Sequence, residues 1–228
     1  MQKITFRILR FKPGRIDPPR YQNFELEVRP HMTVLDCLEK IRLEQDHTLM
    51  YRHSCHHSSC GTCACRINEE EKLACTTKVH EQGVDELTLA PLNGFTQKGD
   101  LVVDIEEFFK DISDEWTYLK DTGAVKSTRM PHGIQGFTRF ENCIECGACV
   151  SACPVKNKNA TFIGPAALSA IHNEIKKTPR TEKELLSLAG KKQGVVLCER
   201  ALNCSRVCPT AVFPARHISD LRRLLAGK

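Results

Sequence analysis

The sequence has few aromatic residues and no long apolar run. Aromatic side chains make up 6% of its 228 residues, and tryptophan occurs once. A membrane-spanning helix needs roughly 18 or more consecutive apolar residues, and no stretch of this chain approaches that length. We therefore expect any contact with a membrane to be made through partner subunits.

The chain also lacks concentrated charge and a targeting signal. The net charge of +5 is spread along the sequence without a basic block interleaved with aromatic residues, so nucleic-acid binding is not expected. The stretch from Met1 to Thr5 enters directly into an alternating pattern, without an apolar leader, a twin-arginine segment or a small-residue cleavage site. We expect an intracellular chain whose thiols stay reduced.

Cysteine, by contrast, is abundant, with 13 in the chain. Such usage predicts disulfides in a secreted protein and metal or redox chemistry in an intracellular one. Most of the cysteines lie in three stretches, at 55–75, 143–153 and 198–208. Each of these stretches is therefore a candidate source of metal ligands.

The first stretch has the spacing of a plant-type [2Fe–2S] site. Cys55, Cys60 and Cys63 follow the pattern C-x4-C-x2-C, and Cys75 stands alone further on. Gly61 can adopt a positive φ and let the backbone approach a cluster closely. A four-cysteine zinc site is the alternative, but zinc favours two C-x2–4-C pairs. Positive charge that would raise a cluster potential comes from Arg52, His56, His57 and Arg66.

The second stretch implies two clusters. Residues 143–154 follow C-x2-C-x2-C-x3-C-P, as in bacterial ferredoxins, where the first three thiolates hold one cluster and the fourth reaches a second. The distant donor that completes the first set is Cys208, which precedes Pro209. We therefore predict a [4Fe–4S] cluster on Cys143, Cys146, Cys149 and Cys208.

The second cluster of this pair lacks one protein ligand. Cys153 joins Cys198 and Cys204, but Ala201 stands where a symmetric two-cluster ferredoxin has its fourth cysteine. Alanine has no donor atom, so three thiolates remain, and this number suits a [3Fe–4S] cluster. The alternative to the whole scheme is a zinc-binding interaction protein, which would be colourless rather than brown.

Apolar periodicity predicts the elements around these stretches. Alternation at 4–9 and 24–28 predicts a strand hairpin, and further strands are expected at 86–90 and 101–105. Helical spacing runs from Val34 to about Gln45, behind Thr33 as the expected N-cap. The two cysteines without a ligand role, Cys37 and Cys65, are interpreted as buried packing thiols.

These elements predict an α+β fold with two domains. Residues 1–105 are expected to form a β-grasp, plant-type [2Fe–2S] ferredoxin domain, and residues 106–136 a linker with a bridging helix. Residues 137–228 are expected to form an all-α, bacterial-ferredoxin-like domain that holds the other two clusters. Its helices are predicted to start at Gly164, after Thr181 and near Pro214.

Several motifs carry a family resemblance across nearly the whole chain: Cys60-Gly61-Thr62-Cys63, Leu73-Ala74-Cys75, Cys143-Ile144-Glu145-Cys146-Gly147, Phe162-Ile163-Gly164-Pro165 and Cys208-Pro209. With these motifs the chain resembles the iron–sulfur subunit of succinate dehydrogenase and fumarate reductase, the respiratory complex II family. The resemblance implies the electron-transfer subunit of an oxidoreductase, with no catalytic residue of its own. It implies a partner flavoprotein with FAD, and electrons passing from [2Fe–2S] through [4Fe–4S] to [3Fe–4S] and on to quinone beside a membrane anchor.

Two positions beside the expected exit differ from that family. Its members commonly have tryptophan after the Cys-Pro pair and histidine after the first cysteine of the last group, whereas this chain has Val155 and Glu199. Two exit partners stay open: a quinone, taken as menaquinone, or a soluble heterodisulfide-reductase-like subunit. A free-standing ferredoxin-like carrier is a third interpretation.

The expected location is the cytoplasmic face of the membrane, as a peripheral subunit, or a soluble cytoplasmic complex. Succinate oxidation in the tricarboxylic acid cycle and fumarate reduction in anaerobic respiration are both open.

Overall fold

The computed structural model describes residues 2–113, 143–177 and 181–227. The chain divides into two compact units. The first unit comprises Met1–Glu107 together with Glu145–Ala152, and the second comprises Phe108–Ile144 together with Cys153–Lys228. The domain boundaries expected at residues 105 and 137 remain predictions, and each unit is described below by itself.

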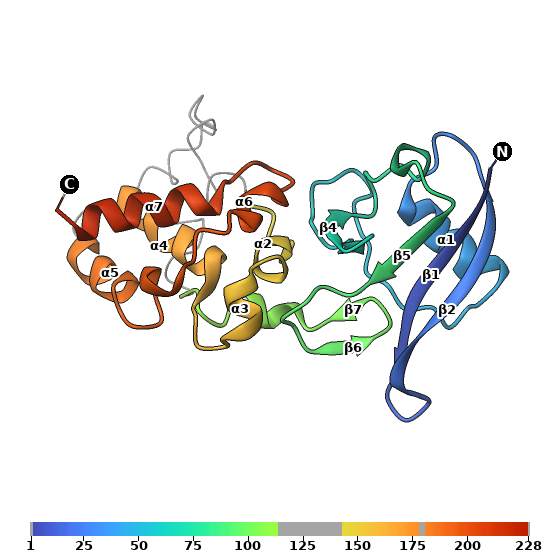
Figure 1. The fold of residues 1–228 in the computed structure, drawn as a ribbon, viewed down its shortest axis with the longest axis horizontal. Helices are drawn as coiled ribbons and strands as arrows, with labels where there is room; N and C mark the ends of the chain where they lie inside the picture. Colours follow the sequence, from blue (N-terminus) through green and yellow to red (C-terminus); the bar gives the residue numbers. More distant parts are fainter. Residues whose placement is uncertain (1, 114–142, 178–180, 228) are drawn as a thin grey trace, which may run out of the picture. The chain divides into compact units, whose positions relative to one another are not determined.

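A mixed five-stranded sheet forms the body of the first unit (Figure 1). Its strands, in spatial order, are β2 (Ile16–Val28), β1 (Gln2–Lys12), β5 (Glu86–Ala90), β3 (Ala64–Ile67) and β4 (Glu70–Leu73). The pair β1–β5 is parallel, and the other neighbours are antiparallel. The predicted hairpin at the N-terminus and the strand at 86–90 are confirmed. Alternate residues of β1, namely Ile4, Phe6 and Ile8, are at most 1% exposed and place the core on one face.

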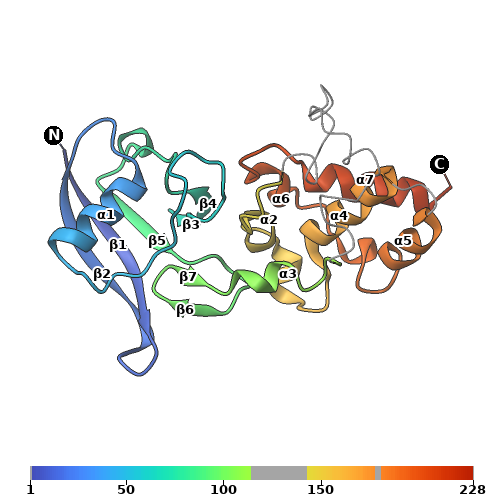
Figure 2. The same ribbon diagram turned by 180° about the vertical axis from the view of Figure 1, so that it is seen from behind.

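Helix α1 (Val34–Glu44) crosses one face of this sheet (Figure 2). The predicted N-cap is confirmed: Thr33 Oγ1 accepts a hydrogen bond from Asp36 N, and Asp36 Oδ2 accepts one from Thr33 N. The apolar stripe of the helix, including Cys37 at 0% exposure, packs into the core. Cys37 is therefore a buried packing thiol, as predicted.

The segment after β5 is less regular than predicted. Strands β6 (Gln97–Gly99) and β7 (Val102–Val103) form a short ribbon, so the strand expected at 101–105 is shorter than predicted. Asp104 Oδ1 accepts a hydrogen bond from Glu106 N, and the chain turns into the 3-10 helix η2 (Ile105–Phe108). The bridging helix predicted for the linker falls largely on residues 114–142, which lie outside the described residues.

The segment Glu145–Ala152 packs within the first unit, although it follows the linker in the sequence. Its helix α2 (Ala148–Ser151) is joined to β4 by a buried hydrogen bond of 2.7 Å, which Ser151 Oγ donates to Glu71 Oε1. Ser151 Oγ also accepts a hydrogen bond of 2.8 Å from Asn93 N. At Gly147, φ is +82°, and an added Cβ would lie 3.1 Å from the Phe95 ring, so glycine permits this close packing.

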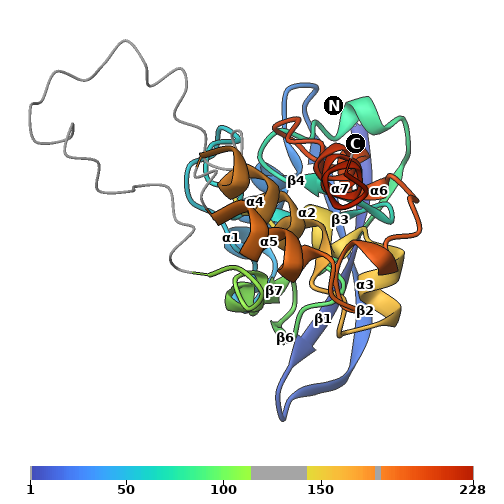
Figure 3. The ribbon, with the colours of Figure 1, turned by 90° about the vertical axis from the view of Figure 1, so that its left-hand side faces the viewer.

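The second unit is helical. Its elements are α3 (Pro154–Lys158), α4 (Gly164–Lys177), α5 (Glu182–Ala189), η7 (Val195–Leu197), α6 (Asn203–Arg206) and α7 (Pro214–Leu225). Helices α4 and α7 lie side by side (Figures 1 and 3), and Leu168, Ile171, Ile218 and Leu221 contribute to their shared core. The helices predicted to start at Gly164, after Thr181 and near Pro214 are confirmed. No helix among the described residues is both long and apolar enough to cross a membrane.

Candidate metal centres

The four cysteines of the first predicted cluster lie in the first unit, on a loop between α1 and β3 and just after β4. Backbone N–H groups of this loop donate hydrogen bonds to the thiol sulfurs. Ser59 N and Cys60 N are each 3.3 Å from Cys55 Sγ, and Ser58 N is 3.3 Å from Cys75 Sγ. Such donors stabilise negative charge on sulfur, which is what a cluster-binding loop requires.

Left-handed residues give the loop its shape. Gly61 has a φ of 69°, as its predicted role in the loop requires, and His56 and Ser58 have φ values of 62° and 60°. Side chains other than glycine adopt this conformation at a cost, and surrounding contacts must hold them there. This conformation turns successive backbone N–H groups towards the sulfur atoms of Cys55 and Cys75, which accept their hydrogen bonds.

The pKa values of these thiols report on the same arrangement. The pKa of Cys55 falls to about 7, chiefly because of the hydrogen bond from His57 N. Burial, together with the nearby thiols of Cys75 and Cys60, raises the pKa of the Cys63 thiol to about 12. The thiols of Cys60, Cys63 and Cys75 thus interact electrostatically. The donor set and its N–H groups fit a [2Fe–2S] cluster.

Arg52 lies half-buried beside this site, with its Nε and Nη2 atoms shielded from solvent. Within the described residues, neither its Nε nor its Nη2 atom has a hydrogen-bond partner. Burial lowers the pKa of its guanidinium, and four thiols raise it, those of Cys65, Cys146, Cys63 and Cys60. Its charge thus interacts with two cysteines of the first predicted cluster and with one cysteine of the second. Sequence patterns indicate only that Arg52 is near the loop, because they do not reveal which face of the loop it occupies.

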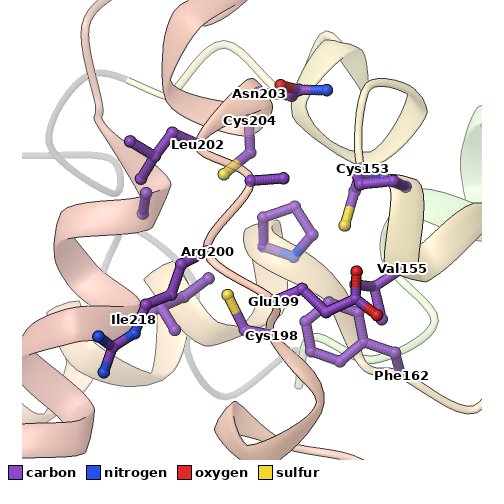
Figure 4. Close-up of a pocket in the computed structure, with 14 residues that line it drawn as sticks. Cys153, Val155, Phe162, Cys198, Glu199, Arg200, Leu202, Asn203, Cys204 and Ile218 are labelled. Carbon is purple, nitrogen blue, oxygen red and sulfur yellow. The ribbon is translucent and has the colours of Figure 1, made fainter.

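The three cysteines of the predicted [3Fe–4S] site lie in the second unit, around one pocket (Figure 4). The pocket lies between α3, the start of α4, α7 and the loop before α6, and its space of about 360 Å³ includes open solvent. The sulfur atoms of Cys153, Cys198 and Cys204 surround this space in Figure 4. Cys153 and Cys204 are each 9% exposed, so their thiols are largely shielded from water. The structure therefore brings together three cysteines that are distant in the sequence.

Ala201 also lines this pocket, in the position where a fourth cysteine was missing from the sequence pattern. Burial, together with the charges of Cys153 and Cys198, raises the pKa of the Cys204 thiol to about 11. Lys156 N lies 3.4 Å from Cys153 Sγ and donates to it. Three neighbouring thiols and one methyl group fit a cluster with three protein ligands.

The loop around the pocket is conformationally unusual. Arg200 and Leu202 both have left-handed backbones, with φ values of 59° and 63°. Two such residues close together fold the chain tightly between Cys198 and Cys204. Sequence reasoning missed this loop geometry, because neither residue is glycine, asparagine or aspartate, the types that signal it.

The [4Fe–4S] ligand set stays a prediction. Cys146 and Cys149 belong to the first unit, whereas Cys143 and Cys208 belong to the second. Within the second unit, Val212 N donates a hydrogen bond of 3.3 Å to Cys208 Sγ, as expected for a sulfur that carries negative charge. Cys65 is 4% exposed, and burial raises its pKa to about 12, which agrees with a packing role.

Comparison with known protein families gives two matches. A 2Fe-2S iron-sulfur cluster binding domain matches residues 5–110, and a 4Fe-4S dicluster domain matches residues 139–212. The two matches cover the two predicted cluster-bearing regions in the predicted order. The α+β fold class, with a [2Fe–2S] domain first, is confirmed.

Individual relatives match over most of the chain. The fumarate reductase iron-sulfur subunit of Wolinella succinogenes is 31% identical over 240 residues, which span 98% of both chains. A fumarate reductase (CoM/CoB) subunit of Methanothermobacter marburgensis is 29% identical over 97% of this chain but 44% of its own length. A chain in the Mycobacterium smegmatis Sdh1 complex in the apo form has the same fold, with a TM-score of 0.80 at 21% identity, over 99% of this chain and 96% of that one.

Proposed function

The chain belongs to the family of fumarate reductase and succinate dehydrogenase iron–sulfur subunits, and from this premise we propose how its residues divide the work of electron transfer. Cys55, Cys60, Cys63 and Cys75 hold a [2Fe–2S] cluster. Cys143, Cys146, Cys149 and Cys208 hold a [4Fe–4S] cluster, and Cys153, Cys198 and Cys204 hold a [3Fe–4S] cluster. The chain itself carries no catalytic residue and performs no chemistry on succinate or fumarate.

The observation that carries this proposal is the convergence of N–H groups on the sulfurs of the first site. Clusters supply reversible one-electron chemistry when bound, and hydrogen bonds to sulfur, net charge and exposure tune their potentials. The residues of the loop keep negative charge on sulfur stable. Buried apolar residues in the wall of the second-unit pocket, among them Val155, Phe162 and Ile218, make the surroundings of the other end of the route apolar.

We propose two partners for the subunit. A flavoprotein with FAD exchanges electrons with the [2Fe–2S] end. At the [3Fe–4S] end, Leu202 and Phe213 are 51% and 49% exposed and line one surface hollow, and such apolar side chains suit a docked partner. That partner is a membrane anchor with bound quinone, which makes the subunit peripheral to the cytoplasmic face of the membrane.

A soluble exit partner is the second candidate. The match to the Methanothermobacter marburgensis relative, whose name includes CoM and CoB, favours it, because the matched part is less than half of that longer chain. In this version a thiol–disulfide subunit replaces the quinone site. Purification of the native complex distinguishes the two candidates by the presence of an anchor subunit or of a thiol–disulfide subunit.

We expect the anaerobically purified chain to be brown and to contain about nine iron atoms, the sum for the three cluster types. Paramagnetic resonance should show three distinct centres, and a larger flavoprotein should accompany the chain from its native source. Zinc in place of iron would contradict the proposal, as would purification without any flavoprotein. The matched control is Cys37→Ser, which should leave the iron content unchanged because Cys37 is a buried thiol without a ligand role.

Replacement of Arg52 should lower the potential of the [2Fe–2S] cluster. Its positive charge is buried beside Cys60 and Cys63 and favours the reduced, more negative cluster. With an effective dielectric constant of about 20, loss of one unit charge beside the cluster lowers the reduction potential of the cluster by roughly 50–100 mV. A redox titration of Arg52→Gln, monitored by paramagnetic resonance, measures the shift.

The control for this prediction is Arg66→Gln. The guanidinium of Arg66 is paired with Glu69 and lies within hydrogen-bond reach of Asn93, so its net field at the cluster is smaller. An Arg52→Gln potential equal to that of Arg66→Gln would show that the buried charge does not act on the cluster.

A further inference from the structure

Three metal-binding side chains meet on the surface of the first unit, outside the cysteine sites. Glu39 lies on α1, and His53 and His56 lie on the loop that leads into the first cysteine group. The distance from His53 Nδ1 to His56 Nε2 is 3.2 Å. Glu39 Oε1 lies 3.6 Å from His56 Nε2 and 3.9 Å from His53 Nδ1. One atom from each residue thus faces a common point.

The spacing of these atoms agrees with the geometry of bound zinc. Zinc ligands lie about 2.0–2.2 Å from the ion, so the atoms of a tetrahedral set are about 3.3–3.5 Å apart. The three distances here lie within about half an ångström of that value. Two imidazoles and a carboxylate leave a fourth position for water, and imidazole favours zinc and similar transition-metal ions over magnesium or calcium.

The local backbone holds the histidines in this arrangement. His56 is left-handed, with a φ of 62°, which turns the chain back after Cys55 and brings its ring towards His53. The two rings meet edge to face, with centroids 5.3 Å apart. The exposed fractions of the three side chains are 35% for Glu39, 36% for His53 and 42% for His56, so an ion can reach them from solvent.

We propose that Glu39, His53 and His56 form a binding site for one divalent transition-metal ion of zinc-like chemistry. The site uses none of the cysteines and is independent of the three clusters. An ion there links α1 to the loop that carries Cys55 and Cys60. The alternative is that one histidine donates a hydrogen bond to the other and the pair needs no ion, and this alternative predicts no metal binding.

The test is calorimetry with Zn²⁺ on the full chain carrying its iron–sulfur clusters, after treatment with a chelator and under anaerobic conditions. We expect one Zn²⁺ per chain and no binding of Mg²⁺ under the same conditions. His53→Ala and His56→Ala should each weaken Zn²⁺ binding by more than about tenfold, since loss of even supporting residues around a metal costs that much. Glu39→Gln should also weaken binding, because an amide is a poor substitute for a carboxylate.

The control variant is His47→Ala. His47 is an exposed histidine of the same unit whose Nδ1 contacts Arg42 O, and it does not belong to the three-residue cluster. Its removal should leave Zn²⁺ affinity unchanged. Glu39 lies on α1, outside the loop that carries the cluster cysteines, so Glu39→Gln decides the question if a loop variant also loses iron. Absence of Zn²⁺ binding, or equal binding by wild type and Glu39→Gln, would overturn the proposal.

Discussion

Ala201→Cys is expected to convert the three-iron site into a four-iron site. Ala201 lines the same pocket as Cys153, Cys198 and Cys204, so a thiolate at this position supplies the fourth ligand. Iron should rise from about nine to about ten atoms per chain. The potential of this centre should fall by roughly 100 mV or more, because cluster type and net charge set the potential. Iron analysis and a redox titration monitored by paramagnetic resonance measure both changes.

A lower potential at this centre should also slow electron transfer to the exit partner. Transfer of an electron from the preceding cluster onto the converted centre then has a smaller driving force, so fewer electrons reach the exit. The assembled complex should keep its flavin reaction with soluble electron carriers and lose most of its turnover through the exit. The spectroscopic result and the turnover result are separate measurements, so they identify which step has changed.

The matched control for this conversion is Ala201→Ser. Serine is similar in size to cysteine but does not offer the thiolate that iron–sulfur clusters prefer. The serine variant should keep about nine iron atoms and the original potential. If the cysteine variant behaves like the serine variant, the pocket does not hold a cluster with a vacant corner at Ala201, and the three-ligand assignment is wrong.

The cysteine sites could be predicted well from the sequence because metal-binding patterns depend on local spacing. Cys55, Cys60 and Cys63 lie on one loop, so their spacing alone indicates that they converge. Cys153, Cys198 and Cys204 are distant in the sequence, and their convergence could be expected only from the ferredoxin pattern. The charge of Arg52 was expected near the first cluster, but the burial of its guanidinium could not be predicted, because burial of a single charged side chain depends on tertiary packing and leaves no periodic signal.

Regular elements were predictable for a similar reason. The capping box of Thr33 and Asp36 and the alternation in β1 both follow from near neighbours in the sequence. The strand expected at 101–105 was too long, because Asp104 caps the turn that follows instead of continuing the strand. The association of α2 with β4 depends on Ser151 and Glu71, which are far apart in the sequence, and no local pattern predicts that contact.

The sequence analysis also missed a cluster of charged residues inside the first unit. We expect this cluster to make a large contribution to the stability of the unit. Arg10, on β1, is 1% exposed, and its Nη1 donates hydrogen bonds of 2.6 Å to Asp46 Oδ2 and to Gln22 Oε1. Its Nε lies 3.1 Å from Oδ1 of Asp100, a carboxylate that is 0% exposed. Asp100 in turn accepts hydrogen bonds from Phe11 N and Met50 N. These groups tie β1 to the chain before the cluster loop and to the turn after β6.

The pH dependence of this cluster has a definite sign. Burial acts to raise the pKa of Asp46, but hydrogen bonds from Thr48 and Arg10 outweigh it and lower the pKa to about 2. A carboxylate whose pKa is lower in the folded state contributes stability above its unfolded pKa, near 3.9, and loses it as the pH falls through about 2. The ion pair of Asp46 and Arg10 therefore makes its full contribution to the free energy of unfolding at pH 7.

Arg10→Met should destabilise the first unit by about 3–5 kcal/mol, because it leaves the buried Asp100 carboxylate without its counter-ion. The melting temperature of the unit should fall by at least about 10 °C, measured by circular dichroism at pH 7 on chains with equal iron content. The matched control is Arg7→Met on the same strand, where an exposed guanidinium lies 4.4 Å from the centre of the Tyr21 ring and contributes about 0.5–1 kcal/mol. Adding Asp100→Asn to Arg10→Met should recover part of the loss, because the stranded charge is then removed. If the two arginine variants melt at the same temperature, the buried ion pair does not stabilise this unit.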